Sequence, residues 1–388
     1  PIIIQNLLTN LVSMADNIMV GQLGTNQMSG VAIINQLFFV FNLLVFGGMS
    51  GAGLFSAQYF GQKNHNGVRD VFRMKILIGI TIIAISLSVM IFLHEPLINM
   101  FLHEGSSSGN IQETFNYAKN YLYIMVIGIA PFVISNCYNT TLKESGQTVV
   151  PMKAGVLAVV FDIVLNYIFI FGKLGFPAMG VVGAAIATVI SRFVECGYLV
   201  IYTHIHSNDY PFIKHCYRTL KVPGSLVKKI IITGAPLMLN EFLWAGGLTL
   251  QTQALSTRGL ATVGGLNICN TIGNISNCIF VTMGTTIAIV VGQLLGAGKL
   301  KEAKVTATRM AAFSLLISFG MIIILGLLGP VFPHFYNTTD EIRELATKFI
   351  WAVAAATPFI SLSNSEYFIL RSRSEERRVG KECRSRWS

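Results

Sequence analysis

The stretch of sequence that decides the fold is Gly24–Gly61, which reads GTNQMSGVAIINQLFFVFNLLVFGGMSGAGLFSAQYFG. A second copy begins at Gly259, an offset of 235 residues (24 to 259), and reads GLATVGGLNICNTIGNISNCIFVTMGTTIAIVVGQLLG. Seven positions match without a gap, and in the first copy these are Gly24, Gly30, Ile33, Asn35, Asn42, Gln58 and Gly61. Glycine allows close helix approach in an apolar run, and an amide in hydrocarbon needs a partner. A duplicated half within a membrane chain is typical of a secondary transporter, whose pathway lies between the halves.

The composition indicates a membrane protein. Hydrophobic residues make up 53% of the chain and charged residues only 12%, and the mean hydropathy is +0.61. A soluble domain carries about twice that charged fraction. We predict an all-α polytopic protein with about ten transmembrane helices, because each apolar run is long enough to span a bilayer. The runs lie at about 1–20, 29–56, 74–93, 115–136, 152–172, 180–203, 228–250, 263–291, 306–329 and 342–370.

The basic residues predict the orientation. Four alternate connections hold fifteen of them: Lys63, Arg69, Arg73, Lys75, Lys143, Lys153, Lys214, Arg218, Lys221, Lys228, Lys229, Lys299, Lys301, Lys304 and Arg309. The other connections hold five. We therefore expect a cytoplasmic N-terminus in a bacterial-type plasma membrane. The net charge of +10 then reflects topology, and we expect no nucleic-acid partner.

The last residues, 373–388, differ in kind from the rest of the chain. They read RSEERRVGKECRSRWS and have no apolar period. The string resembles the translation of a sequencing-library adapter, so we expect a non-native tail. The alternative is a basic juxtamembrane tail that binds anionic lipid.

Six motifs, taken in order, resemble the multidrug and toxic compound extrusion (MATE) family: MADNIMVGQLG around Asp16, AQYFGQKN, NTTLKESGQTVVP, GVVGAAIATVISRFVE, GAPLMLNEFLW and VGQLLGAGK. The resemblance covers residues 1–372 and implies two six-helix lobes. It predicts an N-lobe at 1–205 (helices 1–6), a cytoplasmic inter-lobe loop at 206–227 and a partial C-lobe at 228–372 (helices 7–10). On that pattern the chain is truncated at its C-terminus, where LKESG after helix 4 matches Leu370-Arg371-Ser372.

Buried acids are the candidate functional groups, because an ionisable residue is costly inside a membrane. Asp162 and Asn166 lie four apart, hence on one helix face. In some members of the family, a helix-1 acid and a polar helix-5 pair form a cation-coupling site. The resemblance thus assigns that role to Asp16, Asp162, Asn166 and Thr188, although the usual helix-5 order is Asn then Asp. The alternative is that these groups hold the helices together. Arg192 and Glu195 are expected to form a structural ion pair.

The second lobe offers candidates for substrate binding. Glu241 and Trp244 resemble an Asn-Glu-x-x-Trp element of one family branch. A carboxylate with aromatic rings suits a lipophilic cation. Amides at spacings of 3, 4 and 3 share one face of helix 8. The alternative for this amide face is interhelical packing. The remaining predicted substrate residues are Asn35, Asn267, Asn270 and Asn274.

We therefore predict a cation-coupled (H⁺ or Na⁺) multidrug efflux antiporter that exports lipophilic, often cationic compounds by alternating access. The alternative is a lipid-linked precursor or polysaccharide flippase of the same superfamily, which should line its cavity with cationic residues. We predict no enzyme, because no nucleophile–base or metal constellation falls at membrane depth. The expected partners are small-molecule substrates, the coupling cation and the bilayer, with no cofactor or bound metal, and the chain is expected to be a monomer.

Overall fold

The computed structural model describes residues 2–101, 111–256, 260–335 and 339–372, and within these ranges it consists of helices joined by turns and loops. This confirms the all-helical prediction. The helices pack into two compact units. Unit 1 comprises Ile3–Ser56 and His65–Met238, and unit 2 comprises Ala57–Asn64 and the chain from Leu239 onward.

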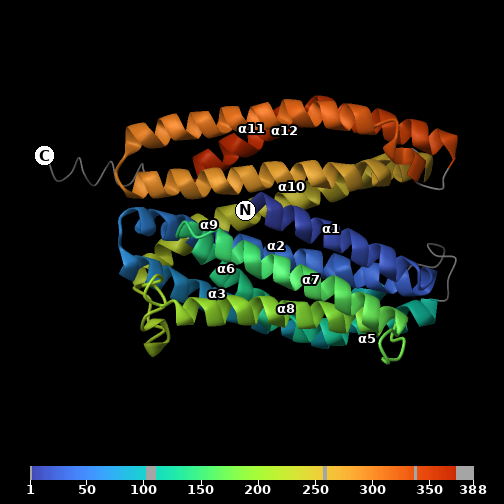
Figure 1. Ribbon diagram of the computed structural model, residues 1–388, viewed down its shortest axis with the longest axis horizontal. Helices are drawn as coiled ribbons and strands as arrows, with labels where there is room; N and C mark the ends of the chain where they lie inside the picture. Colours follow the sequence, from blue (N-terminus) through green and yellow to red (C-terminus); the bar gives the residue numbers. More distant parts are fainter. Residues whose placement is uncertain (1, 102–110, 257–259, 336–338, 373–388) are drawn as a thin grey trace, which may run out of the picture. The chain divides into compact units, whose positions relative to one another are not determined.

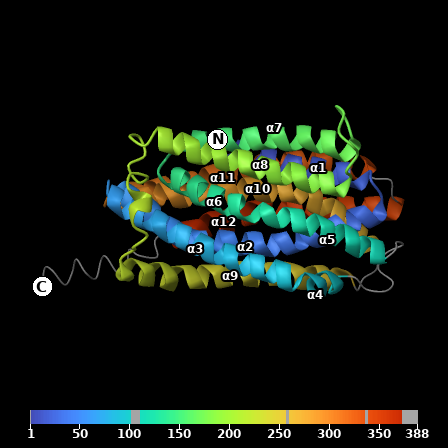
Figure 2. The same cartoon turned by 90° about the horizontal axis from the view of Figure 1, so that it is seen from below.

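Unit 1 holds the helices of the first repeat, except for the end of the second helix from Ala57 onward, which belongs to unit 2. They are α1 (Ile2–Gly21), α2 (Thr25–Gly61), α3 (His65–Phe92), the short α4 (His94–Asn99), α5 (Ile111–Ile127), α6 (Ile129–Glu144), α7 (Val149–Phe171) and α8 (Val181–Ile205). The fourth predicted span is broken at Gly128, where α5 and α6 are bent by 46°. The helix α8 packs along α7 and also contacts α5 and α6 (Figure 2).

Unit 2 is built around α12. Its helices are α9 (Gly224–Ser256), whose first part belongs to unit 1, α10 (Leu260–Gly296), α11 (Leu300–Leu328) and α12 (Asp340–Ser372). The helix α12 packs against both α10 and α11, and the three lie side by side (Figure 1). Their core is apolar and includes Phe280, Leu325 and Ile350, which are almost completely buried.

Within the described residues, seven helices are long and apolar enough to cross a membrane, or eight if the bent α5–α6 pair counts as one span. Helices also occupy the first and seventh predicted spans, as α1 and α9. Neither helix is among the candidate spans counted above. Membrane crossing by α1 and α9 therefore stays a prediction.

The duplication extends to the backbone at the ends of α2 and α10. Lys63 and Gly298, which are 235 positions apart, both have left-handed backbone conformations, with φ of 59° and 74°. Asn64 N donates to Tyr59 O, and Lys299 N donates to Leu294 O at the same offset. This is the Schellman pattern, in which a left-handed residue closes a helix. Both repeats thus end their second helix in the same way.

The connector between α8 and α9 is folded against unit 1. Arg73 on α3 donates hydrogen bonds of 2.9 Å to the carbonyls of His215 and Cys216. The buried Phe212 ring packs against Phe72, with 5.5 Å between the centroids. Cys216 itself is fully buried, and this burial raises the pKa of its thiol to about 11. Much of the predicted inter-lobe loop therefore belongs structurally to unit 1, while the predicted lobe boundaries stay predictions.

Candidate functional site

The four residues predicted to couple a cation lie together in unit 1. Asp162 and Asn166 are one turn apart on α7, and Asn166 Nδ2 donates a 2.7 Å hydrogen bond to Asp16 Oδ1 on α1. The side chains of Asp16 on α1 and of Thr188 and Ser191 on α8 lie near the Asp162 carboxylate. Ser191 was not predicted, but it follows Thr188 by three residues on α8, a spacing that shares one helix face.

This cluster is buried and incompletely satisfied. Asp162 is 5% exposed and Asn166 is 1% exposed. Among the described residues, Asp162 Oδ1 and Asn166 Oδ1 have no hydrogen-bond partner. A buried oxygen without a donor costs free energy. A proton or a small cation bound between these oxygens would remove that cost, so the donor set fits a cation. The role of the four residues stays a prediction.

Arg192 directly follows Ser191 on α8 but does not form the expected ion pair. Its guanidinium carbon lies 5.0 Å from the centre of the Phe132 ring and 5.4 Å from that of Phe38. Its Nη1 donates a long hydrogen bond of 3.5 Å to Gly128 O, where the α5–α6 span breaks. No ion pair with Glu195 occurs in the described part of the chain. The aromatic faces and the Gly128 carbonyl attract the guanidinium instead.

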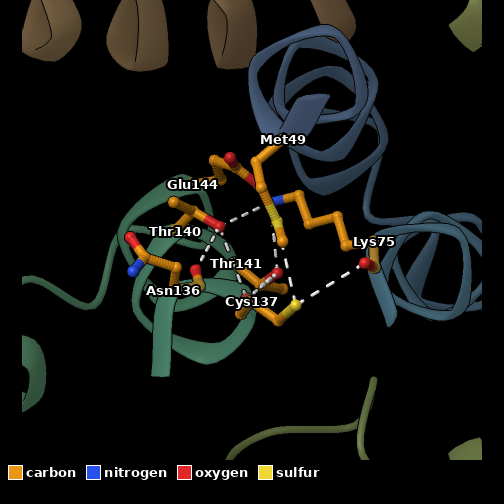
Figure 3. A network of polar contacts seen from close by, with 7 residues as sticks. All are labelled: Met49, Lys75, Asn136, Cys137, Thr140, Thr141 and Glu144. Carbon is orange, nitrogen blue, oxygen red and sulfur yellow. Dashed lines mark hydrogen bonds and ion pairs between the residues drawn. The ribbon is translucent and has the colours of Figure 1, made fainter. Parts of the chain in front are cut away.

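A second polar cluster in unit 1 was not predicted (Figure 3). Lys75 is fully buried, and its Nζ donates to Glu144 Oε2 at 2.6 Å. It also donates to the hydroxyls of Thr140 and Thr141 at 3.0 and 3.2 Å. The topology argument placed Lys75 in a connection, but α3 begins at His65, so Lys75 lies inside a helix. The three donor hydrogens of its ammonium have three acceptors, which defines a structural ion pair.

Gly53 makes room for this ion pair. A Cβ at Gly53 would collide with Glu144 Oε1, so the missing side chain lets the carboxylate lie against α2. The thiol of Cys137 contacts the Met49 sulfur at 3.7 Å and the Lys75 carbonyl oxygen at 3.6 Å. The cluster therefore ties α2, α3 and α6 together within unit 1.

In unit 2 the predicted substrate acid has close polar neighbours. Glu241 is half-buried on α9, and Tyr367 OH donates to its Oε1 at 3.4 Å. Arg371 Nη1 lies 4.0 Å from the same oxygen. Asn240 Nδ2 donates to Tyr367 OH at 3.3 Å. Neither Tyr367 nor Arg371 was predicted, because nothing in the sequence pairs the end of α12 with the middle of α9.

The predicted amide face is exposed in part, because Asn277 is half-buried. Asn270 and Asn274 on α10 are exposed, whereas an amide that held two helices together would be buried. Trp244 is 48% exposed on α9, and Asn35 is exposed on α2 in unit 1. The side chain of Asn267 lies outside the described residues. Their part in substrate binding stays a prediction.

Taken with the duplicated helices, the acids buried among them define a polytopic helical membrane transporter. The chain matches the MatE family over residues 1–168 and 236–379, and it belongs to that family. The MatE family is a family of transporters, so the chain is not an enzyme.

Curated relatives agree with this assignment, and solved structures share the fold. The chain is 28% identical to a probable multidrug resistance protein NorM of Thermotoga maritima, over 88% of this chain and 71% of the relative. It is 27% identical to the NorM of Halalkalibacterium halodurans, over 90% and 75%. The fold resembles that of a Vibrio cholerae MATE transporter, VcmN, with a TM-score of 0.81 at 16% identity over 96% and 84%. A multidrug resistance MATE transporter in an outward-facing conformation gives a TM-score of 0.76 at 19% identity over 96% and 83%.

Proposed function

We propose that the protein exports lipophilic, often cationic compounds in exchange for a coupling cation, by alternating access. The observation that supports this most directly is the buried cluster of Asp16, Asp162 and Asn166. A cation bound there changes the charge of the cluster and so biases unit 1 between two conformations. The probable multidrug resistance proteins named NorM among the relatives support the substrate class.

The alternative of a lipid-linked precursor or polysaccharide flippase is less well supported. Such a protein should present several free cationic groups to an anionic headgroup. The buried cations described above are engaged instead, because Lys75 is paired with Glu144 and Arg192 lies over two aromatic rings. The exposed amides on α10 and the acid on α9 suit a cationic or neutral lipophilic substrate better.

The coupling ion is H⁺ or Na⁺, and we propose that unit 1 binds it. In α12 the position where Na⁺-coupled members carry an acid has Ser361 nearby, and this serine shares a 2.8 Å hydrogen bond with Ser314. Two hydroxyl groups provide no charge for Na⁺, which favours oxygen ligands with negative charge. We also propose a monomer in the plasma membrane with its N-terminus in the cytoplasm.

The test is efflux of ethidium from vesicles that contain the protein, with the Na⁺ and pH gradients collapsed separately. We expect one of the two treatments to stop efflux, and Asp16→Asn to stop it with both gradients present. The matched control is Asp209→Asn, an exposed acid in the connector, which should export at the parental rate. Parental efflux by Asp16→Asn would refute the proposed coupling role.

A further inference from the structure

The carboxylate of Glu241 already has a cation from its own chain beside it. Arg371 Nη1 lies 4.0 Å from Glu241 Oε1, and the two side chains are only 5% and 14% exposed. Tyr367 OH donates to the same carboxylate oxygen. The two charges are thus largely withdrawn from solvent and face each other between α9 and α12.

Aromatic rings complete the surroundings of this guanidinium. Its carbon atom lies 5.5 Å from the centre of the Phe368 ring and 5.9 Å from that of the Tyr367 ring. The two rings are 5.2 Å apart and nearly perpendicular. A carboxylate combined with two aromatic rings within about 6 Å of the cation is the arrangement that recognises an organic cation. Arg371 therefore occupies a place that an unattached organic cation would also fit.

The rings are held in position by the rest of unit 2. A Cβ at Gly284 on α10 would collide with the Phe368 ring, so this ring lies directly on the α10 backbone. Asn240 Nδ2 donates to Tyr367 OH and fixes the other ring. Contacts from α9, α10 and α12 thus preorganise the site, and preorganisation lowers the cost of binding.

We propose that Glu241, Tyr367 and Phe368 form a binding site for organic monocations, and that Arg371 occupies this site as a tethered competitor when no ligand is bound. The inference rests on the proposed function and deepens it, because it assigns an acceptor site to the cationic substrates. It also makes Arg371 a residue that sets affinity.

The geometry favours exchange over permanent pairing. Charge-assisted hydrogen bonds between nitrogen and a carboxylate are about 2.7–2.9 Å long, whereas this pair is 4.0 Å apart. Arg371 lies in the last turn of α12, where the helix dipole stabilises a cation. After a ligand displaces it from Glu241, the guanidinium is therefore still stabilised by the dipole of α12.

The competition has a measurable size. The apparent dissociation constant equals the intrinsic one divided by the fraction of protein whose site is open. If Arg371 fills the site for roughly nine-tenths of the time, its removal lowers the dissociation constant about tenfold. A residue with a purely structural role would leave affinity unchanged or weaken it when removed.

The experiment is equilibrium binding of radiolabelled tetraphenylphosphonium to the purified full chain in detergent. We expect Arg371→Gln and Arg371→Met to bind about tenfold more tightly than the parent, and Arg371→Lys to bind like the parent. Glu241→Gln should bind most weakly. The control is Arg343→Gln at the other end of α12, where Arg343 pairs with the exposed Asp340.

An unchanged or higher dissociation constant in both Arg371→Gln and Arg371→Met, or no binding by either, would overturn the inference. Melting temperatures of both variants separate this outcome from misfolding, and if one variant fails to fold the other decides. The proposed function is judged separately, by gradient-dependent ethidium efflux from the parent. Efflux by the parent without tighter binding by the variants rejects only the tethered competitor. Loss of gradient dependence in the parent rejects the proposed function instead.

Discussion

The two repeats share the caps that end their second helices, whereas units 1 and 2 differ in where they bury charge. Unit 1 encloses the ion pair between Lys75 and Glu144. At the offset of 235 residues, Met310 stands at the position of Lys75. By the separate match of LKESG with Leu370-Arg371-Ser372, Ser372 at the end of α12 corresponds to Glu144 at the end of α6. The duplication thus kept the backbone signals that shape the helices and changed the charged side chains, so the charges indicate what each unit does separately.

Two polar clusters within unit 1 differ in whether their buried polar atoms have hydrogen-bond partners. The ammonium of Lys75 has an acceptor for each of its hydrogens and needs nothing further. The Asp162 cluster leaves carboxylate and amide oxygens without donors in the part of the chain that the structure describes. A satisfied network specifies packing, whereas an unsatisfied one has room for a ligand. This difference separates the structural cluster from the candidate coupling site.

The largest predicted effect on stability comes from replacing Lys75 and Glu144 of unit 1 by the residues that unit 2 has at the corresponding positions. Removing one partner of a buried ion pair costs about 3–5 kcal/mol, because the other charge is left unpaired. We therefore expect Lys75→Met and Glu144→Ser each to lower the free energy of unfolding by about that amount. The double variant should recover most of the loss. The measurement is a double-mutant cycle by denaturant titration in detergent, and losses that simply add would show that the pair is not coupled.

A smaller effect is expected at the connector between α8 and α9. Arg73 makes two hydrogen bonds to connector carbonyls, each worth roughly 1.5–3 kcal/mol when the donor is charged. We expect Arg73→Ala to raise the rate of maleimide labelling at Cys216 at least about tenfold. The buried thiol has a pKa raised to about 11, so labelling should be slow at pH 7 and accelerate as pH rises toward that value.

Mass spectrometry of the labelled peptides measures maleimide labelling at Cys216 separately from labelling at the other cysteines. The matched control is Arg218→Ala, because Arg218 lies on the exposed side of the connector. Equal labelling rates in the parent and in Arg73→Ala would mean that the connector is not held by this arginine.

The smallest effect concerns the shared helix caps. Lys63 holds a left-handed conformation that costs an ordinary residue roughly 1–2 kcal/mol, and the repeat uses Gly298 at the same place. We expect Lys63→Gly to stabilise the protein by about 0.5–1 kcal/mol and Gly298→Lys to destabilise it by a similar amount. Thermal melting of both variants checks the pair. Changes of the same sign in both would contradict the equivalence of the two caps.

The sequence predicted features that repeat or that lie on one helix face. The spacing of Asp162 and Asn166 placed them on one side of α7, and the family motif supplied Asp16. By contrast, Lys75 and Glu144 meet across 69 residues from different helices. Each sits beside a basic connection, where charge is ordinary, so periodicity gave no signal. The Arg371–Glu241 contact was also missed. Tertiary packing brings these two residues together from different helices, so periodicity gives no signal for it.

The central claim is that a cation bound by Asp16 and Asp162 is exchanged for the exported compound. It is tested most directly by the number of cations released when tetraphenylphosphonium binds to the purified protein. The measurement combines a pH-indicator dye in weakly buffered solution with displacement of radioactive ²²Na⁺. The account predicts release of about one cation by the parent and none by the Asp16→Asn/Asp162→Asn double variant. Equal release by the double variant would contradict it.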